Sequence, residues 1–263
     1  AAGVIKVRNF EYASASGTKI ESPELAAAFA DTTLTLKNQA FMINQKWKTE
    51  NVSARISRGA GMFRADNISL TFARGRMNGS YTQNLLTQGQ NLRVSATSVK
   101  AQDLSAAFSL KTTVFGDVSA DLTAAFQGSS LEEIRRTATG ALSLRVGRGK
   151  VKDSFFQKGI FTGPLHKLEE KFSDTEFASA SAEFSFSKGN FAARKIFFDA
   201  EEWNVSLRAE GDFKGQGKAA LEFKFRPSFV ENVANPLLLG IEGRKEGEFY
   251  ELPFACRGDV FSG

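Results

Sequence analysis

The chain is poor in the residues on which most enzymes and metal sites depend. Its 263 residues include one cysteine, Cys256, and one histidine, His166. A single cysteine excludes an internal disulfide and a cysteine metal cluster. Glu169 and Glu170 follow His166 at i+3 and i+4, but without a second histidine a charged surface helix is a better interpretation than a metal site. We therefore expect no catalytic residue, no metal and no cofactor.

The chain also lacks a long apolar run and a cluster of like charges. No stretch of about 18 apolar residues predicts a transmembrane helix, and the N-terminus has no signal-peptide pattern. The net charge of +5 is spread along the sequence, so we expect no nucleic-acid partner. Because the sequence starts at Ala1-Ala2-Gly3 without methionine, we expect it to be a piece of a longer protein, in which any membrane anchor would lie before Ala1.

What the chain does have is phenylalanine and a regular alternation of residue types. It contains 25 Phe but only 3 Tyr and 2 Trp, and Phe offers apolar area without a polar group. Between residues 176 and 226 apolar and polar residues alternate almost without a break, as in Phe184-Ser185-Phe186 and Trp203-Asn204-Val205. Successive side chains on a strand point to opposite faces, so this pattern predicts strands with one apolar and one polar face.

The same pattern recurs along the chain and predicts a mainly β fold with about fifteen strands. A twisted sheet rarely exceeds about 10 strands without curling or splitting. We expect a long, curved, mostly antiparallel sheet rolled into a groove (a half-pipe), with residues 1–110 forming its N-terminal part and residues 111–263 a continuous C-terminal part. A few short helices are predicted: Ser22–Phe29, Leu131–Arg136 with Ser129 or Ser130 as N-cap, Leu165–Phe172 and Phe229–Ala234.

Three interpretations of the apolar face are open at this point. It could be the core of a closed sandwich or barrel, which is the usual case. It could face lipid in a transmembrane barrel, although the scarcity of Tyr and Trp and the capped helices disfavour this. It could also line an open groove that carries lipid. At ~0.8 kcal/mol per methylene, a 16-carbon acyl chain costs about 13 kcal/mol to expose to water, so such a groove would be useful.

Several glycine-bearing motifs favour the third interpretation. They run from Val114-Phe115-Gly116-Asp117 through Phe126–Ile134 and Ala138–Leu144 to Gly149-Lys150-Val151. Further motifs are Gly75–Tyr81 with Leu92–Leu104, Phe177–Gly189, Leu207–Asp212 and Leu252-Pro253-Phe254 with Gly258. Together they resemble the C-terminal region of AsmA-like proteins (AsmA/TamB type), most convincingly over residues 111–260.

This resemblance implies a protein of the Gram-negative cell envelope, located in the periplasm and anchored in the inner membrane by an N-terminal helix. It also implies a groove-shaped sheet that takes part in phospholipid transfer or outer-membrane homeostasis, with no catalytic residues. The expected partners are a phospholipid or another acyl lipid and the inner membrane. Outer-membrane proteins are a further candidate partner. A role as a periplasmic assembly or scaffolding module, which pairs its sheet edges with other β proteins, is the alternative.

The residues expected to line the lipid groove are the apolar members of the alternating strands in the C-terminal half. They are Leu122, Phe126, Leu142, Leu144, Phe184, Phe186, Val205, Leu207, Leu221, Phe223 and Phe225. The apolar stripe of the helix predicted after Pro164 is a candidate gate or lid over the groove, or a cover over an ordinary core; it consists of Leu165, Leu168 and Phe172.

Overall fold

The computed structural model shows a mainly β protein. It describes residues 2–13, 18–44, 47–107, 113–128, 130–152, 174–213, 216–229, 245–246 and 249–259. The N-terminal strands are β1 (Ala2–Ala13), β2 (Lys19–Ala30), β3 (Thr33–Ile43), β4 (Trp47–Gly59), β5 (Met62–Phe72), β6 (Gly75–Asn84) and β7 (Gly89–Lys100). The later strands are β8 (Thr113–Phe115), β9 (Asp117–Gln127), β10 (Thr139–Val146), β11 (Gly149–Lys152), β12 (Asp174–Ser187), β13 (Asn190–Ala200), β14 (Trp203–Asp212), β15 (Gln216–Phe225), β16 (Lys245–Glu246) and β17 (Phe249–Asp259).

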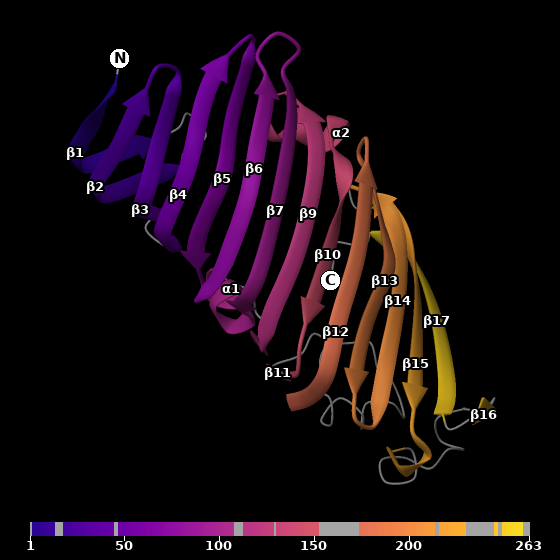
Figure 1. Cartoon of the computed structure of the whole chain (residues 1–263). Helices are drawn as coiled ribbons and strands as arrows, with labels where there is room; N and C mark the ends of the chain where they lie inside the picture. Colours follow the sequence, from indigo (N-terminus) through magenta and orange to yellow (C-terminus); the bar gives the residue numbers. More distant parts are fainter. Residues whose placement is uncertain are drawn as a thin grey trace.

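All 17 strands belong to one sheet. The long strands pair antiparallel with their neighbours in chain order, and β7 pairs with β9, β10 with β12 and β15 with β17. The short strands β8, β11 and β16 extend these ladders. Figure 1 shows how the sheet twists along its length from β1 to β17. The prediction of one long, antiparallel sheet is confirmed.

The sheet is open and forms a single layer. No register pairs β1 with β17, and the described strands form no second sheet. The interpretation of the apolar positions as the core of a two-sheet sandwich is therefore wrong. Two short helices lie at opposite ends of the strands, α1 (Ala101–Ala107) after β7 and α2 (Leu131–Thr137) between β9 and β10 (Figure 1).

Helix α2 confirms one predicted helix and decides between its two predicted caps. Ser130 is the N-cap, and its hydroxyl accepts the backbone N–H of Glu133 at 3.1 Å. The Glu133 carboxylate accepts the backbone N–H of Ser130 at 3.1 Å, which completes a capping box. The predicted helix at Leu165–Phe172 lies outside the described residues. Of the predicted helix at Phe229–Ala234, only Phe229 is among the described residues.

The predicted helix at Ser22–Phe29 is wrong, because this segment forms most of β2. Leu25, Ala27 and Phe29 are spaced by two residues and pair across from Val7, Ile5 and Gly3 of β1. Pairing with two neighbouring strands outweighs the helical preference of the alanines, since sheet contacts come from residues distant in sequence.

The strands of the N-terminal half break their alternation at residues with a left-handed backbone. Asn38 in β3, Asn51 in β4, Asn67 in β5 and Ser98 in β7 have φ of 51°, 53°, 52° and 54°. Each lies at a β-bulge or irregularity, where one extra residue moves the following side chains to the other face. Asparagine tolerates this conformation better than most residues because its short side chain can hydrogen-bond locally.

Candidate functional site

The candidate site is one face of the sheet, which the strand registers assemble from alternate residues. Leu142 of β10 lies opposite Leu122 of β9 on one side and Phe184 of β12 on the other. Leu207 and Leu221 are opposite each other on β14 and β15. Through such pairs all the residues predicted to line a groove share this face, which we call the apolar face; they are Leu122, Phe126, Leu142, Leu144, Phe184, Phe186, Val205, Leu207, Leu221, Phe223 and Phe225.

Most of this face remains accessible. Among the predicted residues only Val205, Phe223 and Phe225 are buried, with 5%, 0% and 1% of their surface exposed. The others are half-buried: Leu122, Phe126, Leu142, Leu144, Phe184, Phe186, Leu207 and Leu221. In a closed core, side chains of this size would be largely buried. The apolar face therefore has an accessible stretch, which runs over β9, β10 and β12 to Leu207 of β14 and Leu221 of β15, and a covered end at Val205, Phe223 and Phe225.

An aromatic cluster forms the covered end. The ring centroids of Phe177 and Phe198 are 4.9 Å apart, and those of Phe198 and Trp203 are 5.1 Å apart. Beyond Trp203 the contacts continue through Phe223 and Phe225 to Phe229, whose ring stacks on Phe225 at 5.5 Å. Aromatic pairs at these distances add to the stability gained from burial. The cluster fixes the ends of β12 to β15 and seals this part of the face.

Over the accessible stretch, phenylalanine rings lie across glycines of adjacent strands. A Cβ built on Gly140 would come within 2.7 Å of the Phe186 ring and 2.1 Å of the Thr123 carbonyl oxygen. A Cβ on Gly211 would come within 3.2 Å of the Phe191 ring. Only glycine leaves room for such a close approach. The rings therefore lie against the sheet and do not project from it, so the apolar face is continuous at these glycines.

The apolar face continues into the N-terminal half, which the sequence prediction did not include. Leu122 lies opposite Val94 of β7, Val94 opposite Gly79 of β6, and Gly79 opposite Ile68 of β5. The prediction also omitted the aromatic residues Phe177, Phe198, Trp203 and Phe229. Alternation could have identified Trp203, which precedes Val205 by two residues. The bulges in β5 and β7 hide the apolar-face residues of those two strands, such as Ile68 and Val94.

The opposite face of the sheet is polar. The Lys218 ammonium lies 2.7 Å from the Glu210 carboxylate, and Lys100 and Lys224 pair with Asp117 and Glu251. The pairs of Lys218 and Lys100 are exposed, and such pairs each contribute only about 0–1 kcal/mol. In the third pair the Glu251 side chain is only 15% exposed. This face therefore provides solubility rather than a strong cohesive force.

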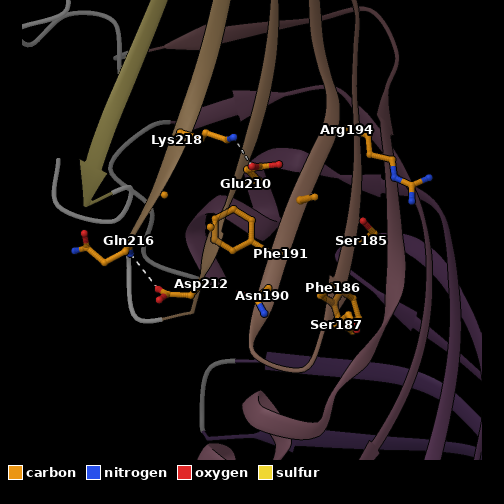
Figure 2. Close-up of a pocket in the computed structure, with 13 residues that line it drawn as sticks. Ser185, Phe186, Ser187, Asn190, Phe191, Arg194, Glu210, Asp212, Gln216 and Lys218 are labelled. Carbon is orange, nitrogen blue, oxygen red and sulfur yellow. Dashed lines mark hydrogen bonds and ion pairs between the residues drawn. The ribbon is translucent and has the colours of Figure 1, made fainter.

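A large hollow lies mainly on the polar side, at the β12–β13 and β14–β15 turns. It has a volume of about 1030 Å³, and Figure 2 shows its lining, with the ion pair of Glu210 and Lys218 and the bond from the Gln216 backbone to Asp212. Of the predicted lining residues only Phe186 reaches it. The predicted residues therefore form an open surface rather than this hollow.

The remaining predicted features are not placed by the structure. The candidate gate residues Leu165, Leu168 and Phe172 and the only histidine, His166, lie outside the described residues. Within the described part of the chain, no group of three or more His, Cys, Asp or Glu side chains could hold a metal ion. No helix of the described residues is long and apolar enough to cross a membrane.

Comparison with known proteins supports the family resemblance. The sequence profile of the AsmA family matches residues 22–196, which is more than half of the chain. The match extends further into the N-terminal half than the motifs at residues 111–260, on which the resemblance mainly rests. No curated protein and no solved structure is significantly similar to the chain.

Proposed function

The chain belongs to the AsmA family, and from this premise we propose that its apolar face carries the acyl chains of membrane lipids, without catalysis. AsmA family proteins are associated with the cell envelope. Within the envelope we propose a periplasmic location as part of a protein anchored in the inner membrane. The lipid, a phospholipid or another acyl lipid, would move along the sheet between the inner and outer membranes.

The observation that carries this proposal is a continuous apolar face that stays half-exposed on a single-layered sheet. Each methylene that this face shields from water contributes about 0.8 kcal/mol. The stabilisation of an acyl chain is non-directional, so it needs no specific polar contact at each position. A lipid can therefore shift from strand to strand without losing a fixed set of hydrogen bonds.

Lipid extraction from the purified protein, followed by mass spectrometry, tests this function. We expect co-purified phospholipid and uptake of a fluorescent phospholipid by the wild-type protein. The double substitution Phe184→Glu with Leu207→Glu places two carboxylates on the accessible stretch. It should abolish uptake and leave the β-type circular dichroism spectrum unchanged, since both side chains are half-buried and the new charges can reach water.

The matched control places carboxylates on the polar face of the same strands, as Ser185→Glu with Arg208→Glu. This variant should take up lipid as the wild type does. Absence of bound lipid and of uptake in the wild-type protein would contradict the proposal. Equal uptake by both double variants would also contradict it.

A second candidate function is scaffolding through the sheet edge. Strand β1 has several exposed apolar side chains, including Val4 at 63%, Ile5 at 49% and Tyr12 at 52%. An exposed, apolar edge strand can pair with a strand of another protein. This candidate predicts a protein partner that is lost when proline replaces Val4 or Lys6, and no lipid in the extract.

A further inference from the structure

One end of the apolar face carries a row of polar residues. At the β4–β5 and β6–β7 turns, beside α2 in Figure 1, successive strands place Arg58, Phe63, Gln83, Gln90 and Phe126 opposite one another. We call these five residues the rim row. They share the apolar face because each lies two residues from a member of the next row, which comprises Ile56, Ala65, Tyr81, Leu92 and Ala124.

Polarity falls from the rim row inward. The rim row has a guanidinium and two amides, and the next row has a single phenol, Tyr81. The third row, which includes Ile68, Val94 and Leu122, has no polar side chain in these strands. Rows on one face of a sheet are about 7 Å apart. The face therefore changes from charged to apolar over about 14 Å. A phospholipid changes in the same order, from its charged phosphate through its ester groups to its apolar acyl chains.

Hydrogen bonds hold part of this region in place. The Tyr81 hydroxyl donates to the Gln90 side-chain oxygen at 2.6 Å, and the Gln90 amide nitrogen donates to the Gly128 carbonyl oxygen at 2.6 Å. Burial raises the pKa of Tyr81 above its ordinary value of about 10, so the phenol remains a donor at neutral pH. The Phe63 and Tyr81 rings form a T-shaped pair with centroids 6.1 Å apart.

Two groups of the rim row retain unused donors. Among the described residues, the Arg58 guanidinium makes no ion pair or hydrogen bond, and the Gln83 amide nitrogen donates to no protein group. Gln83 is half-buried beside Phe63, whereas Arg58 is exposed. A guanidinium suits the bidentate recognition of a phosphate, and an amide N–H suits a carbonyl oxygen.

We propose that the rim row binds the phosphate and ester groups of an anionic phospholipid, with Arg58 on the phosphate and Gln83 on an ester carbonyl. The inference rests on the proposed function and adds a fixed position for the polar end of the lipid. Strands are about 4.8 Å apart, so β4 and β6 place the two residues about 10 Å apart, and the arginine side chain can extend over part of this distance. The acyl chains then extend past Tyr81 and Leu92 along the apolar face.

Binding of two fluorescent lipids with identical acyl chains tests the rim row. Phosphatidylglycerol carries the phosphate, and diacylglycerol lacks it. We expect Arg58→Gln to weaken phosphatidylglycerol binding by about tenfold, as the loss of a hydrogen bond to a charged group predicts, and to leave diacylglycerol binding unchanged. Gln83→Met should weaken the binding of both lipids because both have ester carbonyls.

The control variant is Arg64→Gln. Arg64 lies next to Phe63 on β5, is exposed and points to the polar face, so this change should affect neither lipid. Glycerol 3-phosphate, which has the phosphate but no acyl chain, should not compete at concentrations that saturate the lipid. Its competition would instead indicate a site for free phosphate.

The outcomes separate the two proposals. Suppose that the wild-type protein binds both lipids, and that Arg58→Gln weakens the binding of neither lipid or weakens the binding of both equally. The proposed role of the rim row is then wrong, and the proposed function stands. If the wild-type protein binds neither lipid, both proposals are wrong. A circular dichroism spectrum and a melting temperature equal to those of the wild type confirm that Arg58→Gln is folded.

Discussion

At the residue scale, the position of a side chain on the strand decides its role. Phe223 and Leu122 both lie on the apolar face, but Phe223 is fully buried in the aromatic cluster, whereas Leu122 is half-buried on the accessible stretch. The first contributes to stability through its ring contacts with Trp203 and Phe225. The second contributes less to stability, and its accessible surface is available to the proposed lipid.

The close approach at Gly140 gives a residue-scale prediction. Gly140→Ala should lower the free energy of unfolding by about 1–3 kcal/mol, because the new methyl group would press on the Thr123 carbonyl and the Phe186 ring. Gly147→Ala is the control, since a Cβ there meets nothing within 4 Å. Urea titration measures both variants. Equal stability of the two would show that Gly140 is not tightly enclosed.

At the scale of elements, the bulges explain which strands the sequence predicts well. Strands β9, β10, β14 and β15 alternate without a break, so their apolar members could be assigned to one face correctly. In the N-terminal half the alternation changes phase within a strand. In β3, for example, the register with β4 shifts between Leu36 and Gln39, where Asn38 has φ of 51°.

The rest of the site depends on contacts between distant residues, which alternation cannot predict. The register that places Gln83 opposite Gln90 follows from the β6–β7 turn, but the continuation to Arg58 and Phe126 requires two further ladders. Phe229 joins the aromatic cluster only because the chain after β15 folds back over Phe225. Strand identity was therefore easier to predict than the extent of the face.

A substitution at the β5 bulge tests the role of the left-handed residues. Asn67→Val should destabilise the protein by about 1–2 kcal/mol, because a β-branched residue is strained at φ of 52°. Asn67→Gly should change stability little, since glycine adopts this conformation freely. Thermal unfolding followed by circular dichroism compares the two variants. If valine were tolerated as well as glycine, β5 would not need its bulge at this position.

At the scale of the whole molecule, the account depends on one open sheet with two different faces. The polar face has exposed ion pairs, and the apolar face stays accessible except at the aromatic cluster. Rows of apolar side chains cross from β5 to β15 without interruption by a charged residue, as in the series Ile68, Gly79, Val94, Leu122, Leu142, Phe184, Ala193, Ala209 and Ala219. The proposed movement of a lipid across strands requires such continuity.

Site-specific photo-cross-linking tests this account most directly. A benzophenone side chain placed at Leu142 would lie on the apolar face, and one placed at the adjacent Ser143 would lie on the polar face. After incubation with phospholipid vesicles and illumination, mass spectrometry should detect a phospholipid adduct at position 142 and none at position 143. Adducts of equal yield at both positions, or at neither, would contradict a lipid pathway on the apolar face.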